Sequence, residues 1–180
     1  MKKIISAMAL VAAVAASGAS IQWNLSLGRS GLIADSTGAA LNGNLYLVLT
    51  SSAGDLASAA ESDTFAATLD SVALDSMTLS GGKNTATKTT TSPRLVVDQN
   101  YSFSLVVYDA ANSQYYLSSA LGETAYDETA AVVTPTKVTF TATMVGSTSG
   151  KTWASTSVPE PATAALALLG LGLMIKRRKA

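Results

Sequence analysis

The chain has 180 residues and a formal net charge of zero, with twelve basic and twelve acidic side chains. It contains no cysteine and no histidine, which excludes disulfides, thiol catalysis and histidine general bases, and removes the usual zinc and copper ligands. Once the two apolar ends are set aside, the length suits one ordinary domain.

The charge is distributed unevenly along the chain. Half of the basic residues lie at the two ends. Between Ser20 and Ser157 there are six basic and eleven acidic residues, so this body carries a net charge near −5. Nucleic-acid binding needs clustered lysine and arginine to neutralise phosphates. We therefore expect no nucleic-acid partner.

Residues 1–19 predict a signal peptide. Lys2 and Lys3 supply a positive start, and residues 4–16 form an uncharged, mostly apolar run. The small residues Ser17, Gly18 and Ala19 follow, and signal peptidase needs small side chains at the −3 and −1 positions. We expect cleavage after Ala19. The alternative is a buried N-terminal helix, since the run is short for a membrane span.

Residues 20–146 predict a single β domain. Several segments alternate apolar and polar side chains with period two, which places one face on a core and the other toward solvent. Turn-forming clusters separate these segments. The stretch 85–92 is rich in threonine and predicts a strand or an exposed loop. The alternating positions are Ile21, Trp23 and Leu25; Leu45, Leu47 and Leu49; Tyr101, Phe103, Leu105 and Val107; and Val138, Phe140, Ala142 and Met144.

Two parts of the body have different patterns. Within residues 55–72 the apolar side chains Phe65, Leu69 and Val72 stand three or four apart, which predicts one or two short helices, with Thr64 as a cap. Residues 106–117 read VVYD, AANS and QYYL, which predicts a hairpin with a short polar loop.

The fold class that these patterns favour is a mainly β domain. We predict a single antiparallel β-sandwich, immunoglobulin-like in architecture, with a short helical insertion. Residues 147–157 are short, polar and without a period, so they predict a linker, apart from Trp153, which we expect to dock back on the body.

The C-terminus has three parts in a fixed order: Pro159, Glu160 and Pro161, then the uncharged run 162–175, then Lys176, Arg177, Arg178 and Lys179. The prolines keep the first part extended and stop any helix before residue 162. Fourteen helical residues span about 21 Å, whereas the hydrocarbon core of a bilayer is about 30 Å thick. A helix over 162–175 is therefore only marginally long enough to cross a membrane, unless the basic side chains that follow it extend to the interface. The four cations favour the cytoplasmic side of a membrane, which would leave the body outside it.

This arrangement resembles the PEP-CTERM sorting signal, in which a Pro-Glu-Pro motif, an apolar helix and a basic cluster end the chain. The resemblance covers residues 158–180. It implies recognition by exosortase, a membrane enzyme of Gram-negative bacteria that make extracellular polysaccharide. It also implies removal of the tail and sorting to the cell surface or the surrounding matrix. The alternative is an ordinary tail-anchored protein with a chance Pro-Glu-Pro sequence.

A search for catalytic residues finds no motif. Gly146 to Gly150 has the spacing of a nucleophile elbow but carries Thr148 at the nucleophile position, in a predicted linker. Paired carboxylates for glycoside hydrolysis stay formally open, although most of them lie in predicted turns. We expect no enzyme activity, no cofactor and no metal site. The carboxylates considered are Asp98, Asp109, Glu123, Asp127 and Glu128.

Three tyrosines are the best candidates for a ligand patch. Tyr115 and Tyr116 are adjacent in a predicted strand, so one of them faces away from the core, and that residue together with Tyr108 is the predicted patch. Exposed tyrosines stack on sugar rings. The alternative is ordinary strand packing.

Three functional hypotheses follow. The first is a non-enzymatic structural protein of the cell surface or extracellular matrix, processed by signal peptidase and exosortase with the inner membrane as an intermediate. The second is an extracellular carbohydrate-binding module for polysaccharide. The third is an inner-membrane protein that keeps its C-terminal helix.

Overall fold

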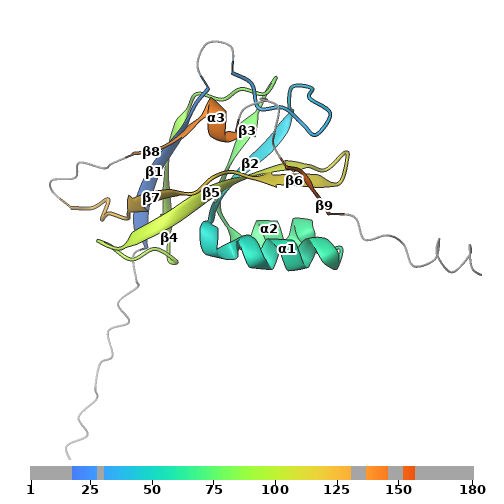
Figure 1. Cartoon of the computed structure of the whole chain (residues 1–180). Coiled ribbons are helices and arrows are strands. Elements are labelled where there is room, and N and C mark those ends of the chain that lie inside the picture. The colour runs from blue at the N-terminus through green and yellow to red at the C-terminus, as the bar shows by residue number, and fades with distance from the viewer. Residues whose placement is uncertain (1–17, 28–30, 131–136, 146–151, 157–180) are drawn as a thin grey trace, which may run out of the picture.

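Two β-sheets and a pair of helices make up the fold in the computed structural model, which describes residues 18–27, 31–130, 137–145 and 152–156 (Figure 1). The smaller sheet has the order β4-β1-β8, from β1 (Ala19–Ser26), β4 (Thr87–Ser92) and β8 (Lys137–Thr141). The larger sheet has the order β3-β2-β5-β6-β9, and β7 pairs with β5 off this path. Its strands are β2 (Gly43–Leu49), β3 (Ala73–Leu79), β5 (Asn100–Asp109), β6 (Gln114–Leu117), β7 (Leu121–Thr124) and β9 (Ala154–Ser155).

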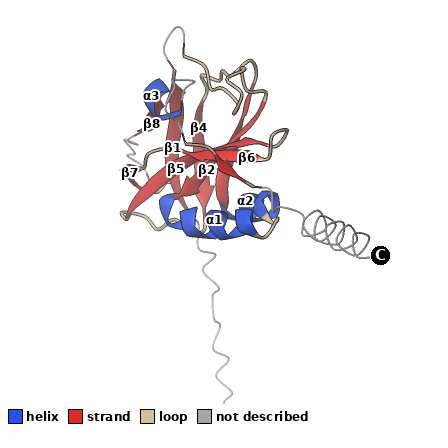
Figure 2. Ribbon diagram, turned by 45° about the vertical axis from the view of Figure 1, so that its right-hand side comes forward, coloured by secondary structure: helices blue, strands red, loops and turns tan. Residues whose placement is uncertain are grey.

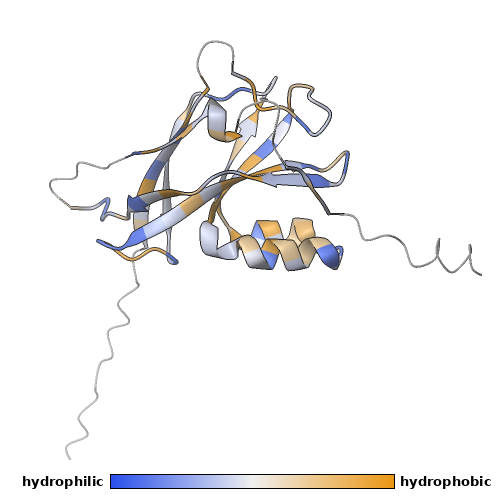
Figure 3. Cartoon of the chain, viewed as in Figure 1, coloured by the Kyte–Doolittle hydropathy of each residue, from blue (hydrophilic) through white to orange (hydrophobic). Residues whose placement is uncertain are grey.

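The main core lies between the two sheets. Every second residue of β1, β2 and β5 points into it, as the period-two pattern predicts. In Figure 3 these strands carry both hydrophobic (orange) and hydrophilic (blue) segments. The prediction of a mainly β fold with packed sheets is confirmed, whereas the immunoglobulin-like topology stays a prediction. The largest fully buried side chains of this core are Trp23, Phe103, Phe140, Ile21, Ile33, Leu45, Leu47 and Leu105.

One strand pair differs from the predicted antiparallel arrangement. Strand β1 pairs antiparallel with β4 but parallel with β8, from Gln22 opposite Lys137 to Ser26 opposite Thr141. A purely antiparallel sandwich is therefore wrong for this sheet. The alternation within each strand fixes which face is buried, and it carries no information on the direction of a neighbour that is distant in sequence.

The helical insertion is confirmed and has a defined position. A 3-10 turn, η1 (Thr50–Ser52), leads into α1 (Ala53–Glu61) and α2 (Phe65–Val72). Both helices lie along the face of the larger sheet that is turned away from the smaller sheet (Figure 2). Thr64 occupies the N-cap position of α2, but its side chain makes no capping hydrogen bond.

The helices cover strand positions that the sequence pattern assigns to solvent. Val48 of β2 and Val106 of β5 are fully buried against Leu56, Phe65 and Leu69. The larger sheet is consequently buried on both faces near its centre. The domain has three layers in order: the small sheet, the large sheet and the helix pair.

The predicted hairpin is present, since β5 pairs with β6 from Val106 opposite Leu117 to Asp109 opposite Gln114. The threonine-rich stretch forms strand β4. The strand predicted through Met144 is shorter than expected: β8 ends at Thr141, and one helical turn, α3 (Ala142–Val145), follows. This turn places Val145 in the main core and packs Met144 against it.

A loop between β1 and β2 is fixed by close backbone contacts. Ile33 is fully buried, and its N–H donates to the carbonyl of Gly82 at 2.9 Å. Gly82 has a φ of +69°, and a Cβ there would lie 2.5 Å from the Ile33 carbonyl oxygen. Only glycine combines this backbone conformation with so close an approach.

Among the described residues no helix is long and apolar enough to cross a membrane. The predicted apolar helix 162–175 lies outside the described residues, as does most of the predicted signal peptide.

Candidate functional site

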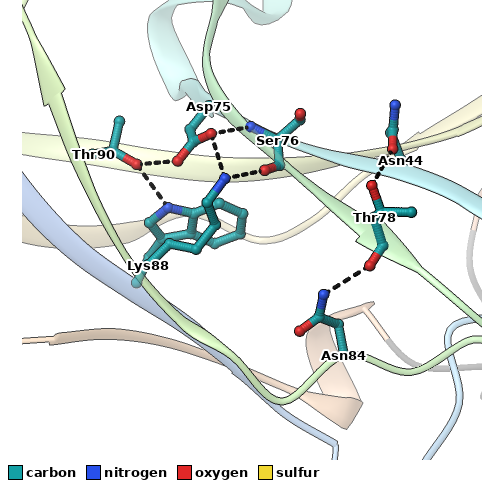
Figure 4. Close-up of polar contacts among 8 residues, drawn as sticks. Asn44, Asp75, Ser76, Thr78, Asn84, Lys88 and Thr90 are labelled. Carbon is teal, nitrogen blue, oxygen red and sulfur yellow. Dashed lines mark hydrogen bonds and ion pairs between the residues drawn. The ribbon is translucent and has the colours of Figure 1, made fainter.

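A network of buried and half-buried polar groups joins the two sheets at one edge (Figure 4). Asp75 of β3 accepts a hydrogen bond from Lys88 Nζ at 2.7 Å and one from Thr90 Oγ1 at 2.5 Å. The indole N–H of Trp23 donates to Thr90 Oγ1 at 3.0 Å. Lys88 and Thr90 belong to β4 of the smaller sheet, so the network ties β4 and β1 to β3 of the larger sheet.

The charge state of this network suits a structural role. Burial would raise the pKa of Asp75, but hydrogen bonds from Lys88, Thr90 and the Ser76 amide outweigh burial and hold that pKa below its ordinary value. The carboxylate therefore stays ionised beside the lysine ammonium at neutral pH. Close by, Thr78 donates from Oγ1 to Asn44 Oδ1 at 3.0 Å, and Asn84 Nδ2 donates to the Thr78 carbonyl at 2.7 Å.

Asp109, one of the carboxylates considered for catalysis, holds two loops together. It is buried and accepts hydrogen bonds from the amide and hydroxyl of Ser36, at 3.0 and 2.7 Å. It also accepts from the amide and side chain of Asn112, at 3.2 and 2.8 Å. Burial would raise the pKa of Asp109, but the bonds from Ser36 and Asn112 lower it to about 2.

The other carboxylates considered for catalysis take part in local contacts. Glu128 Oε2 accepts from the hydroxyls of Ser20 and Thr91, each at 3.2 Å. Asp127 caps the turn at Thr129, and Glu123 accepts from the Thr124 amide. Asp98 has a φ of +62° in the turn before β5. Within the described residues, no three acidic side chains are grouped so that they hold a metal ion.

The three candidate tyrosines lie on opposite faces of the larger sheet. Tyr108 and Tyr115 are directly opposite each other on β5 and β6, and both pack on Phe65 of α2 with ring centroids 5.1 and 4.4 Å away. Tyr116 points to the other face, where its hydroxyl donates to the Met144 carbonyl at 2.8 Å. Tyr108 therefore shares one face with Tyr115, the member of the adjacent pair that faces away from the main core, and α2 packs on that face through Phe65.

Two of the three predicted signal-cleavage residues belong to the fold. Ala19 is the first residue of β1, is 1% exposed, and pairs with Ser92. Gly18 lies so close to β4 that a Cβ there would be 2.3 Å from the Ser92 carbonyl carbon. Ser17 lies outside the described residues.

The segment predicted as a linker contains a docked strand. Its residues Ala154 and Ser155 form β9 and pair antiparallel with Tyr115 and Gln114 of β6. The ring of Trp153 lies 6.2 Å from that of Tyr116, as expected for a side chain that docks on the body. The pairing of β9 with β6 and the Asp75 network are the features that the sequence search missed, because both join residues from distant strands.

The sorting-tail residues Pro159, Glu160, Pro161, Lys176, Arg177, Arg178 and Lys179 all lie outside the described residues. Comparison with known families supplies the evidence here. Residues 157–179 match the model of the PEP-CTERM protein-sorting motif. No match to the chain was found among curated proteins or among solved structures. The chain thus carries a PEP-CTERM protein-sorting motif at its C-terminal tail, and such a tail implies export and processing by exosortase.

Proposed function

We propose that this protein is a non-enzymatic structural component of the cell surface or extracellular matrix of a Gram-negative bacterium. Signal peptidase removes the N-terminal segment, the inner membrane holds the chain through its C-terminal apolar run, and exosortase then releases it. The match at residues 157–179 is the observation that carries this proposal.

The side-chain chemistry of the domain supports a scaffold role. Two of its acidic groups, the buried Asp109 and the half-buried Asp75, are engaged by several donors each, and these contacts join separate strands and loops. Tyr108 and Tyr115 are packed under α2, which leaves them poorly placed to stack on a sugar ring. Polar groups whose hydrogen bonds are made within the domain stabilise the fold and are not free to bind a substrate.

Processing is tested in a host that encodes exosortase and in the same host with that gene deleted. We expect the full chain to be shortened to a C-terminus near Pro159 only where the enzyme is present, as read by mass spectrometry of the secreted protein. A matched variant, Pro159→Ala with Glu160→Ala and Pro161→Ala, should keep Ala180 in both hosts. A chain that retains Ala180 in the parent host is membrane-retained and contradicts release.

The non-enzymatic part is tested separately with the purified secreted protein. We expect no hydrolysis of polysaccharide from the host matrix and no loss of matrix-associated protein in an Asp109→Asn variant that still folds. Hydrolysis by the parent protein that Asp109→Asn abolishes would overturn this part of the proposal.

A further inference from the structure

We infer that signal peptidase cuts on the N-terminal side of Gly18, so that the mature chain keeps Gly18 and Ala19 as the start of its domain. A cut after Ala19, which the pattern of small residues predicts, would remove both. This inference rests on the proposed function, because it places the cut that export through a cleaved leader requires.

Ala19 belongs to the main core. Its side chain is 1% exposed and lies in the same cluster as Ile21 and Leu95. Its amide donates to the Leu95 carbonyl at 3.2 Å, and Ala19 pairs with Ser92 at the end of the ladder between β1 and β4. The chain turns between Ser92 and Leu95, so Ala19 fastens this turn to the core. A cut after Ala19 would remove a core side chain together with these backbone contacts.

Gly18 fits closely against the backbone of the same turn. A Cβ at Gly18 would lie 2.3 Å from the carbonyl carbon and oxygen of Ser92 and 2.7 Å from the nitrogen of Pro93. These are backbone atoms, so they cannot move aside as the end of a long side chain can. Backbones approach so closely only at glycine. A leader that is discarded has no use for such a fit, and we therefore assign Gly18 to the folded chain.

Ser20 is poorly suited to be the first residue of the mature protein. It is 0% exposed, its amide donates to the Tyr126 carbonyl at 2.8 Å, and the Tyr126 amide donates back to the Ser20 carbonyl at 2.9 Å. A cut after Ala19 would turn the Ser20 amide into a charged α-ammonium group at this buried position, which is unfavourable.

The nearby carboxylate of Glu128 would offset only part of this cost. Its Oε2 accepts from the Ser20 hydroxyl at 3.2 Å, so a favourable charge lies close to the new ammonium group. Glu128 is exposed, however, and water screens the attraction between charges at an exposed position. The same Oε2 also accepts from the Thr91 hydroxyl. Retention of Ala19 avoids the buried charge altogether.

The sequence offers suitable bonds upstream of Gly18. Signal peptidase needs small side chains at the −3 and −1 positions. Ala15 and Ser17 fill these positions for a cut after Ser17, and Ala13 and Ala15 fill them for a cut after Ala15. Either cut leaves Gly18 and Ala19 in the mature chain. The residue rule alone thus permits several bonds, and the packing of the two retained residues favours the upstream ones.

Mass spectrometry of the N-terminal peptide of the exported protein tests the inference. We expect the mature chain to begin at Gly18 or at a residue shortly before it. A processed chain that begins at Ala19 or Ser20 would overturn the inference and leave the proposed function intact. A chain that still begins at Met1 would contradict the proposed function, because no leader would then have been removed, and the inference would fail with it.

A substitution in the leader gives a second test that does not depend on folding. Ala15→Leu puts a large side chain at the −3 position of the cut after Ser17 and at the −1 position of the cut after Ala15, but it lies outside both positions for a cut after Ala19. We expect the parent start to be lost, with precursor accumulating or a later start appearing. Ala16→Leu is the matched control and should keep a start at Gly18. Unchanged processing of Ala15→Leu would overturn the inference.

The structural reason for the upstream cut is tested by urea unfolding of three forms of the full chain, released from the same cleavable fusion partner. These forms begin at Ala16, Gly18 or Ser20. We expect the first two to share one midpoint and the form that begins at Ser20 to unfold at a urea concentration lower by about 0.5 M or more. Equal midpoints for all three forms would overturn the argument from packing.

The close fit of Gly18 is tested in the exported protein itself. Gly18→Ala should lower the urea midpoint if the residue is retained, whereas it has no effect on a mature chain that begins at Ser20. Gly43→Ala is the matched control, because Gly43 also begins a strand segment and a Cβ there would meet nothing within 4 Å. Exported Gly18→Ala with the parent midpoint would overturn the inference.

Discussion

The two strands that adjoin the terminal segments are built into the domain in very different ways. Strand β1 lies at the centre of the smaller sheet, paired on both sides, and carries the fully buried Ile21 and Trp23. Strand β9 has two residues, lies at the edge of the larger sheet and pairs only with β6 among the described strands. The N-terminal junction is thus part of the core, whereas the last described segment is held by a short pairing at a sheet edge.

The largest expected effect is at β1. Trp23→Ala removes a fully buried indole together with its hydrogen bond to Thr90, which should cost about 3–5 kcal/mol of unfolding free energy. Urea unfolding of the purified secreted protein measures it. A loss of unfolding free energy no larger than the loss caused by Trp153→Ala would contradict the difference between the two strands.

An intermediate effect is expected at Asp109, which fixes the turn that leads into β6. Its pKa is about 2 in the folded protein against 3.8 for the free side chain, so its contribution to stability is complete above about pH 4 and is lost as the pH falls toward 2. The contribution is at most about 2 kcal/mol, and less where water screens the contacts.

Unfolding free energies measured between pH 5 and pH 2 check the Asp109 prediction. The parent protein should lose stability across this window, and Asp109→Asn should be less stable at pH 5 and lose less on acidification. An unchanged slope in Asp109→Asn would assign the acid sensitivity to other groups, with Asp75 the first to examine because its pKa is also lowered.

The smallest effect is expected at β9. Trp153→Ala removes one ring contact at a sheet edge, and about 1 kcal/mol or less of global unfolding free energy should follow. Hydrogen exchange should nevertheless rise at Thr156, whose amide is bonded to Ser113, while the amides of β1 stay protected. Increased exchange in β1 would show that the two junctions are coupled.

Local patterns predicted much of the fold. The alternation around Trp23, Leu47 and Phe103 identified strands, and the helical spacing of Phe65, Leu69 and Val72 identified α2. These predictions hold because each depends on residues that are close in sequence. The direction of β8 beside β1 was missed, because that pairing joins segments more than a hundred residues apart.

Two further features were missed for identifiable reasons. The covered outer face of the larger sheet has a trace in the sequence: Leu105, Val106, Val107 and Tyr108 are apolar or aromatic without interruption, as in strands buried on both faces. Strand β9 cannot be recognised in the sequence, because two residues are too few to show a repeating pattern of apolar and polar side chains. Of the candidate site, the sorting tail was recognisable by the order of its parts, whereas the Asp75 network joins side chains that only folding brings together.

The parallel pair of β1 and β8 also sets the order of events for a chain that crosses a membrane N-terminus first. Asn24 meets Thr139, a partner 115 positions later. The central strand of the small sheet consequently lacks one neighbour until nearly all of the domain has emerged. In a chain exported N-terminus first, the small sheet is therefore complete only after Thr139 has emerged.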